Sequence, residues 1–380
     1  MSEYNLKHYH SHLNTAAQIL ELFDGSIPFA YFIKNHFSQN KKFGSKDRKQ
    51  ISRLCYAFFR LGKSFPGLNT KERILTGLKN CSDPIEPQWQ QMFDDYNLPE
   101  TPPQNIFPWK RELGETIDAT AFEASFATQP LLFLRIRPGH EKNVSRKLEN
   151  AGLPFSIDRN TVALPNSAKA DGILLLNKEV VVQDFSSQKT GLLLDEVKNN
   201  FPAGYTISVY DCCAASGGKS IMAFDLLQNI QLTVSDIRPA IIANLQKRFK
   251  EAGISNYDSF VGDISAKNFN YKEQYDLVIA DVPCTGSGTW ARTPDQLYYF
   301  TDTKIDKYVS LQNSIIQNAV KVVKPGGFLL YITCSVFKKE NEEQVQNITR
   351  RGVSLLKQQV IKGYENKADS MFAALLCKTT

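Results

Sequence analysis

Two cysteines, Cys284 and Cys334, stand at places where a thiol could do chemistry. Cys284 lies in DVPCTG, directly after the apolar run YDLVIAD, and Cys334 ends the apolar run FLLYITC. Most free cysteines are small buried core residues, and that is the plain structural explanation for each of them. Both, however, are expected on loops at the carboxyl ends of neighbouring parallel strands, where ligands bind. We therefore predict that the two thiols share one reactive pocket.

A pair of thiols suits the methylation of a pyrimidine at carbon. A thiolate that adds to carbon 6 of cytosine turns carbon 5 into a nucleophile, which can then take a methyl group. A base must afterwards remove the carbon 5 proton, and a second thiolate or a carboxylate can supply it. Asp281 could steady the pyrimidine edge. Methyltransferases that act on amino groups often carry [DN]PP[YF] here, and DVPC lacks the aromatic residue.

Other reaction classes lack the residues that they need. The five histidines all lie at or before position 140, so a C-terminal reaction centre would have to work without imidazole. This excludes Ser-His-Asp and Cys-His hydrolases there. The seven cysteines are odd in number and include no CxxC pair, so we expect neither a disulfide framework nor a metal site.

The segment DCCAASGGKS, residues 211–220, follows a predicted strand and opens a predicted helix. A P-loop would need glycine at Cys213, and a dinucleotide fingerprint would need G-x-G-x-x-G, which is absent. A methyltransferase loop that cradles S-adenosylmethionine and a helix start without a ligand both stay open. Acidic residues at successive strand ends favour the cofactor: Asp236, Asp263 and Asp281. Singly each could be a turn residue, but three in series indicate a site.

The elements that must position these residues change along the chain. Residues 4–80 show helical periodicity, and the prolines of residues 82–109 predict an irregular linker. Residues 130–185 read as strand, helix, strand, strand. From residue 187 short apolar runs alternate with helices, which predicts a parallel, doubly wound α/β sheet.

Composition is that of a globular protein, with 42% hydrophobic and 22% charged residues. No apolar run approaches a membrane span, and the opening residues lack the features of a signal peptide, so we expect a cytoplasmic protein. Residues 1–80 carry 13 Lys or Arg against 5 Asp or Glu. Such a basic segment could bind a polyanion, or could simply be a solvated helix face.

At these residues the sequence resembles the Sun/Nop2/RsmB family of RNA cytosine-5 methyltransferases. The family signatures CAAPGGK, DxPCSG and TCS with a following EN pair are similar to CAASGGK, DVPCTG and TCSVFKKEN here, and the resemblance extends over residues 130–380. It implies a Rossmann-like class I methyltransferase domain that uses S-adenosylmethionine, with Cys334 as the nucleophile and Cys284 assisting product release. Asp281 is the third catalytic candidate. The implied cofactor-binding residues are Cys212, Cys213, Ala214, Ala215, Ser216, Gly217, Gly218, Lys219, Asp236, Asp263 and Asp281.

One departure from the family pattern is Ser216, which replaces a proline and loosens the backbone there. FGSKDRKQISRLCYAFFR resembles the NusB-like RNA-binding domain of the bacterial 16S rRNA enzymes. The resemblance implies RNA contacts by Lys41, Lys42, Lys46, Arg48, Lys49 and Arg53, although Arg48 could equally tie helices together, as Asp47 could.

We therefore expect three parts: a helical NusB-like domain (1–125), a small α+β RNA-binding or lead-in module (126–186) and a methyltransferase domain (187–380). The expected substrate is a cytosine in 16S rRNA, and the expected state is a monomer without a metal or a membrane. The alternatives are a tRNA cytosine-5 methyltransferase and a non-catalytic rRNA-binding assembly factor.

Overall fold

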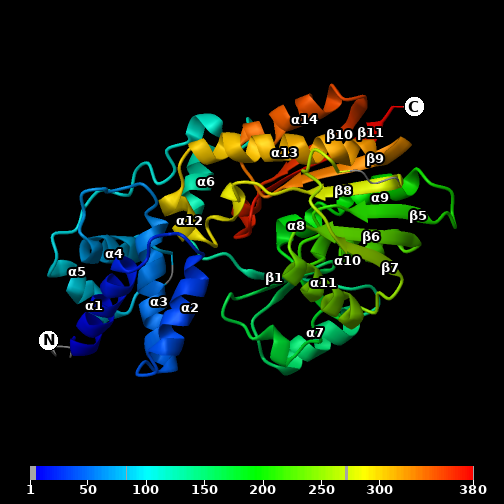
Figure 1. Ribbon diagram of the computed structural model, residues 1–380. Helices are drawn as coiled ribbons and strands as arrows, with labels where there is room; N and C mark the ends of the chain where they lie inside the picture. The colour runs from blue at the N-terminus through cyan, green and yellow to red at the C-terminus, as the bar shows by residue number, and fades with distance from the viewer. Residues whose placement is uncertain (1–5, 83, 270–272, 380) are drawn as a thin grey trace. The chain divides into compact units, whose positions relative to one another are not determined.

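A computed structural model describes residues 6–82, 84–269 and 273–379 of the 380-residue chain (Figure 1). The chain forms two compact units. Unit 1 comprises residues 1–111, 118–129 and 289–302, and unit 2 comprises the remaining segments, 112–117, 130–288 and 303–380. The expected boundaries near residues 126 and 186 stay predictions. None of the described helices is both long and apolar enough to cross a membrane.

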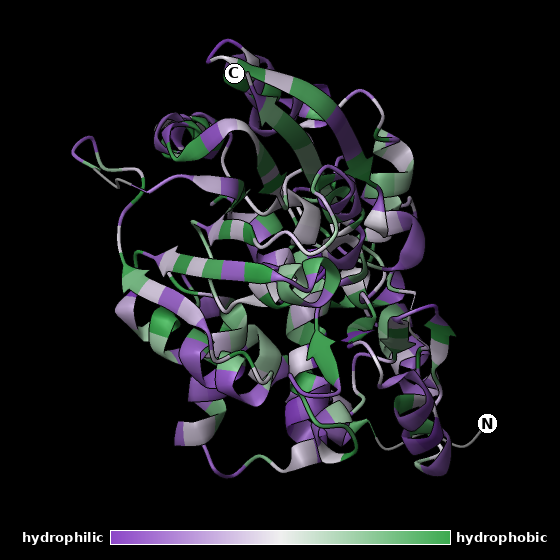
Figure 2. Ribbon diagram, turned by 90° about the vertical axis from the view of Figure 1, so that its right-hand side faces the viewer, coloured by the Kyte–Doolittle hydropathy of each residue, from purple (hydrophilic) through white to green (hydrophobic). Residues whose placement is uncertain are grey.

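Unit 1 is helical, as the periodicity of its sequence predicts. Its helices are α1 (Lys7–Glu21), α2 (Phe29–Gln39), α3 (Ser45–Arg60), α4 (Thr70–Lys79), α5 (Pro87–Asp94), α6 (Ala119–Ser125) and α12 (Pro294–Tyr299). Apolar side chains such as Leu13, Phe29 and Phe59 form its core and are buried. Helices of the chain carry hydrophobic and hydrophilic residues side by side, as amphipathic helices with one buried face do (Figure 2).

Helix α2 lies within residues 4–80, which we predicted to be helical. Helix α5 differs from the prediction, because it lies inside the proline-rich segment that we expected to be irregular. Pro87 stands at the first position of α5, where its missing N–H costs no helical hydrogen bond. Trp89 and Met92 on α5 are buried, so packing stabilises a helix that the proline density argues against.

The small module of unit 2 has a four-stranded antiparallel sheet, in the order β2-β3-β1-β4, among the described residues. Its elements are β1 (Leu132–Ile136), α7 (Glu141–Asn150), β2 (Ser156–Asp158), β3 (Thr161–Leu164), a 3-10 turn (Ala170–Gly172) and β4 (Val180–Val182). The predicted strand, helix, strand, strand order is confirmed, and β4 completes the sheet. Helix α7 packs Val144 and Leu148 into the core of this module.

The rest of unit 2 is a seven-stranded sheet within the described residues, in the order β10-β11-β9-β8-β5-β6-β7. The strands are β5 (Ile207–Asp211), β6 (Ile230–Asp236), β7 (Tyr257–Val261), β8 (Tyr275–Asp281), β9 (Val323–Thr333), β10 (Val353–Ile361) and β11 (Met371–Lys378). Strands β5 to β9 pair in parallel, and β10 and β11 are antiparallel. The predicted parallel α/β sheet is confirmed.

Helices cover both faces of this sheet (Figure 1). One face packs against α9 (Leu192–Asn199), α10 (Gly218–Leu227) and α11 (Pro239–Glu251), and the other against α13 (Thr303–Lys321) and α14 (Glu342–Thr349). A short α8 (Phe185–Lys189) precedes α9. The chain leaves β5 for β6 on one side and later returns to β8 on the other. This reversal creates a crevice at the carboxyl ends of β5 and β8, where ligands bind in such folds.

Candidate active site

The glycine loop, residues 212–217, joins β5 to α10 at this crevice. Gly217 has a φ of +83°, and a Cβ at this position would lie 2.6 Å from Phe249 Cε1. Only glycine therefore fits without displacing the packed ring. Ala215 also has a positive φ, +45°, which costs an L-residue on the order of 1 kcal/mol. The loop is thus held in a conformation that its own backbone does not favour.

Hydrogen bonds to neighbouring strand ends hold the loop in this conformation. The Cys212 N–H donates to the Ile279 carbonyl of β8 at 3.0 Å, and the Ala214 N–H donates to the Ser235 carbonyl of β6 at 3.0 Å. The Ala215 N–H donates to Asp236 Oδ2 at 3.2 Å. Cys212 and Ala214 are buried and act as structural parts of the loop, whereas Ala215 and Ser216 are exposed.

Three ionisable residues, Asp211, Lys219 and Asp281, lie at the base of the loop. Asp211 is fully buried, its Oδ2 accepts from Ser220 Oγ at 2.6 Å, and its Oδ1 is buried without a hydrogen-bond partner. Burial raises the pKa of Asp211 to about 7, and the nearby Asp281 adds to this. Lys219 Nζ pairs with Asp281 Oδ2 at 3.0 Å and donates to Ser187 Oγ at 2.7 Å. Lys219 thereby connects the α10 terminus to the end of β8.

Asp236 ends β6 beside the glycine loop, as predicted, and it is 6% exposed. Arg238 binds both of its carboxylate oxygens, each at 2.9 Å. Burial alone would raise the pKa of Asp236, but the Arg238 hydrogen bonds hold it below its ordinary value. Asp263 does not end the third strand as expected, because β7 stops at Val261. It is exposed, and it accepts from the N–H of Ser265 at 2.8 Å.

The two predicted cysteines meet beyond the ends of β8 and β9. Cys284 Sγ lies 3.2 Å from Cys334 Sγ, and both side chains are half-buried. The hydrogen bond to Cys334, followed by burial, raises the pKa of Cys284 well above its ordinary value. Cys284 is therefore a protonated thiol at neutral pH, able to donate its S–H to the sulfur of Cys334.

A buried carboxyl group braces the loops that carry these thiols. Glu340 is fully buried and accepts hydrogen bonds from the Thr285 N–H at 2.9 Å and from Gln312 Nε2 at 2.9 Å. The hydroxyls of Thr285 and Ser335 also donate to Glu340. Thr285 follows Cys284 and Ser335 follows Cys334, so one side chain ties both cysteine loops together. Burial raises the pKa of Glu340.

The neighbouring residue Asn341 adds a second brace. Its Oδ1 accepts from Thr333 Oγ1 at 2.6 Å, and its Nδ2 donates to the Ser335 carbonyl at 2.9 Å. The Gly288 N–H donates to the Cys334 carbonyl at 2.9 Å. A Cβ on Gly288 would lie 2.0 Å from the Ser370 carbonyl oxygen, so this approach requires glycine. The backbone around Cys334 is therefore held on both sides.

Sequence reasoning missed some of these residues. Glu340 and Asn341 belong to the TCSVFKKEN motif, but we predicted no role for either residue. Both side chains are 0% exposed, and this burial can be seen only in the folded structure. Arg248, which binds Ser216, was not considered at all, because nothing near it in α11 resembles a motif. No group of three or more metal-ligating side chains occurs in the described ranges.

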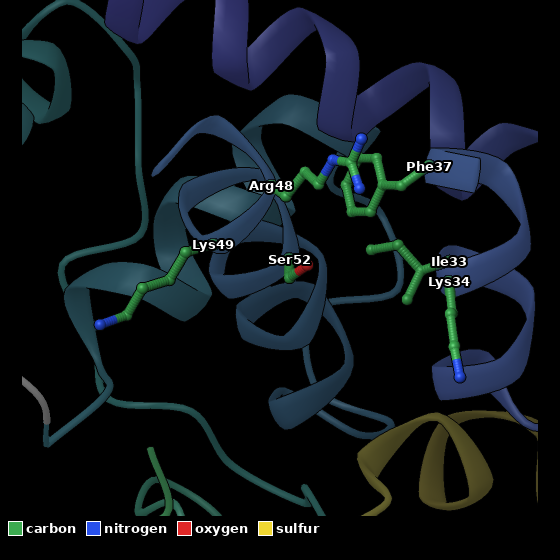
Figure 3. A pocket seen from close by; sticks show the side chains of 6 residues that line it. All are labelled: Ile33, Lys34, Phe37, Arg48, Lys49 and Ser52. Carbon is green, nitrogen blue, oxygen red and sulfur yellow. The ribbon is translucent and has the colours of Figure 1, made fainter. Parts of the chain in front are cut away.

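The predicted RNA-binding residues lie in unit 1, around the start of α3. Among them only Arg48 and Lys49 line a hollow of about 340 Å³, whose full lining is Ile33, Lys34, Phe37, Arg48, Lys49 and Ser52 (Figure 3). Arg48 lies over the Phe37 ring and donates to the Phe43 carbonyl at 2.9 Å.

The other members of this predicted set divide into bonded and exposed side chains. Arg53 donates to the Pro84 carbonyl, and Lys42 lies 5.1 Å from the centre of the Phe43 ring. Lys41 and Lys46 are exposed. Asp47 accepts from the Gly44 N–H and pairs with His12, each at 3.0 Å. Asp47 and Arg48 thus hold helix ends, which is the structural alternative that the sequence left open.

Residues 202–375 match the family model described as 16S rRNA methyltransferase RsmB/F. A ribosomal RNA small subunit methyltransferase B of Xylella fastidiosa is 27% identical over 257 residues, which cover 64% of this chain and 59% of the relative. The protein of the same name from Shewanella oneidensis is 29% identical over 206 residues, which cover 54% of this chain and 46% of the relative. The chain thus spans about half the length of these curated relatives.

Solved structures share the fold at low sequence identity. The crystal structure of PH0851 superposes with a TM-score of 0.72 and 18% identity, covering 99% of both chains. NSun6 from Pyrococcus horikoshii, solved with SFG, superposes with a TM-score of 0.61 and 16% identity, covering 72% of this chain and 97% of that one. These likenesses show a Rossmann-like methyltransferase fold.

Proposed function

The chain belongs to the RsmB/F methyltransferase family through residues 202–375, and on that premise we propose that it methylates carbon 5 of a cytosine in RNA. The proposed methyl donor is S-adenosylmethionine, and the proposed substrate is 16S rRNA. The observation that carries the proposal is the pair of thiols, Cys284 and Cys334, 3.2 Å apart at the carboxyl edge of the sheet. Methyl transfer to an amino group would need no thiol, whereas attack on carbon 6 of a pyrimidine does.

The state of the two thiols supports Cys334 as the nucleophile. Cys284 keeps its proton because its pKa is raised, and its S–H can stabilise negative charge on the Cys334 sulfur. Attack by the Cys334 thiolate would form a bond from Sγ to carbon 6, and the electrons of the carbon 5–carbon 6 double bond would move to carbon 5. Carbon 5 would then attack the sulfonium methyl group, and the methyl–sulfur bond would break with its electron pair left on a neutral thioether. A stacked base does not expose carbon 6, so the cytosine must be unstacked or flipped.

Release of the product requires a base. Removal of the carbon 5 proton would restore the double bond, break the bond from carbon 6 to sulfur and return Cys334 as a thiolate. We assign this step to Cys284, which would first give its S–H proton to solvent water and would then, as a thiolate, accept the carbon 5 proton. Glu340 is a positioning residue in this scheme, because it holds Thr285 and Ser335 beside the two thiols. Asp281 would contact the pyrimidine edge.

The residues at the crevice fit S-adenosylmethionine. A Cβ on Gly218 would meet nothing within 4 Å, so the start of α10 is open toward a ligand, and the buried Asp211 Oδ1 lacks a protein partner. When bound, the cofactor supplies an electrophilic methyl group on a sulfonium. The loop of residues 212–219 would hold its methionine part, Asp236 would accept from the ribose hydroxyls, and Asp263 would face the adenine. Arg238, whose side chain is 59% exposed, would turn away from Asp236.

The test is bisulfite sequencing of total RNA from cells with and without this gene. We expect one cytosine of small-subunit rRNA to lose its protection in the deletion strain and to regain it with the wild-type gene but not with Cys334→Ala. Loss in tRNA instead would overturn the proposed substrate. If no cytosine changes in a strain without a redundant enzyme, the catalytic proposal fails and a non-catalytic assembly factor replaces it.

A further inference from the structure

We propose that Arg248 is a positioning residue for the cofactor loop, and that it joins the small module to that loop. The proposal rests on the proposed function, because it concerns binding of S-adenosylmethionine at the crevice. Arg248 Nη1 donates to both the carbonyl and the hydroxyl oxygen of Ser216, each at 2.7 Å. Among the described residues these are the hydrogen bonds that Ser216 makes.

Ser216 needs such a partner because of its neighbours. It follows Ala215, which has a φ of +45°, and precedes Gly217, which has a φ of +83°. A positive φ thus occurs on each side of Ser216, and the φ of the serine itself is not restricted by a ring. Both Ala215 and Ser216 are exposed, so no packing holds them. The guanidinium of Arg248 therefore restricts the backbone at Ser216 through two hydrogen bonds, as the ring of a proline would do covalently.

Arg248 is itself held from the small module. Its Nε donates to Asn177 Oδ1 at 3.0 Å. Asn177, three residues before β4, is 9% exposed and has a φ of +63°. Its side-chain N–H donates to Glu251 Oε2 at 2.7 Å, and its carbonyl accepts from Arg137 Nη1 at 3.0 Å. A continuous set of hydrogen bonds thus runs from Arg137, the residue after β1, through Asn177 and Arg248 to the glycine loop.

This arrangement predicts a loss of cofactor affinity rather than of chemistry. Arg248→Ala should raise the Kd for S-adenosylmethionine, measured by calorimetry, by roughly tenfold, the size expected for charge-assisted hydrogen bonds. KM for the cofactor should rise in parallel, and kcat should change little. Asn177→Gly, which tolerates the positive φ, should give a smaller rise. Lys247→Ala, an exposed neighbour on α11, is the matched control and should bind like the wild type.

A second variant distinguishes a role of Arg248 in positioning the loop from a role in folding. Ser216→Pro in the Arg248→Ala background should restore most of the affinity, because proline stiffens the loop without the guanidinium. In the cofactor-free protein, Arg248→Ala should speed hydrogen exchange at residues 215–217, and Ser216→Pro should slow it again at residues 215 and 217. Unchanged affinity and exchange in Arg248→Ala would overturn the inference. Loss of affinity that Ser216→Pro does not rescue, with a lowered melting temperature, would assign Arg248 a purely structural role.

Failure of the underlying function gives a different result. If the wild-type chain itself does not bind S-adenosylmethionine or its analogue SFG, the proposed function fails. If the wild type binds and every variant binds equally well, only the role of Arg248 is wrong. The exchange measurement needs no cofactor, so it tests the loop contact in either case.

Discussion

The sulfur atoms of Cys284 and Cys334 lie 3.2 Å apart, although 50 residues separate them in the chain. The distance follows from the parallel pairing of β8 and β9, in which the last paired residues are Asp281 and Ile332. Each thiol lies a few residues beyond its strand. Glu340 and Asn341 then hold the two loops so that the sulfurs face each other.

We expect Cys334→Ala to abolish methyl transfer while the affinity for S-adenosylmethionine stays within about twofold of wild type. The alanine removes only the attacking sulfur, whose hydrogen-bond partner is Cys284 rather than the glycine loop. Radiolabel transfer to RNA and calorimetry measure the two properties. Cys377→Ala is the control, because Cys377 pairs with Phe328 away from the carboxyl edge. Turnover by Cys334→Ala would refute the assignment.

Cys284→Ala should accumulate a covalent adduct between the protein and RNA. Attack by Cys334 remains possible in this variant, but the base that removes the carbon 5 proton is missing. The adduct would appear as a slow band in denaturing gels after incubation with cofactor and a competent RNA. The double variant Cys284→Ala/Cys334→Ala should give no such band. Rapid turnover without an adduct would show that another group serves as the base.

Gly217→Ala and Gly218→Ala form a matched pair one residue apart. The first places a methyl group 2.6 Å from Phe249 at a φ of +83°, whereas nothing lies within 4 Å of a Cβ on Gly218. We expect Gly217→Ala to lower the free energy of unfolding by about 1 to 3 kcal/mol and to weaken cofactor binding. Gly218→Ala should leave stability unchanged or slightly raised. Equal effects of the two changes in chemical denaturation would contradict the strained-loop interpretation.

Asp225 anchors the small module to α10 through a buried ion-pair cluster. Its carboxylate binds Arg135 at 2.7 Å and Arg137 at 2.8 Å, and the Asp225 side chain is 3% exposed. Asp225→Ala leaves two buried guanidinium groups without a carboxylate, so we expect a loss of about 3 to 5 kcal/mol in denaturant unfolding. Glu196→Ala, which breaks the exposed pair with Lys357, should cost less than about 1 kcal/mol. Similar losses of unfolding free energy in the two variants would show that burial does not determine how much these ion pairs contribute to stability.

The raised pKa of Asp211 leads us to expect that the stability of the fold depends on pH. Its folded pKa of about 7 lies above the value of 3.8 in the absence of the fold. The carboxyl group therefore favours the folded state most at low pH, and this contribution is lost as the pH rises from about 4 to about 7. Asp211→Asn, which cannot ionise, should be more stable than wild type at pH 8 by up to about 4 kcal/mol and nearly equal at pH 4.

Thermal unfolding of the wild type and Asp211→Asn across this pH range measures the difference. Asp258→Asn is the control for the substitution itself, because Asp258 is exposed on β7. A stability gain for Asp211→Asn that does not grow between pH 5 and pH 8 would mean that Asp211 ionises normally in the fold.

The sequence by itself determined the elements and the chemistry. Alternating apolar runs and helices predicted the parallel sheet, because period and length are local properties that a strand carries wherever it pairs. Cys284, Cys334, Gly217 and Asp236 could be named as candidates because each follows or ends a strand. Burial overrode local signals at α5, where a proline-rich stretch folds as a helix around Trp89.

Only the tertiary structure decided which side chains meet. The 3.2 Å approach of the thiols depends on the register of β8 against β9, which no local pattern encodes. The contact of Glu340 with Thr285 joins residues 55 positions apart in the chain, and the contact of Arg248 with Ser216 joins residues 32 positions apart. Such contacts arise when the sheet and its covering helices close around polar groups, because each buried donor or acceptor must then find a partner.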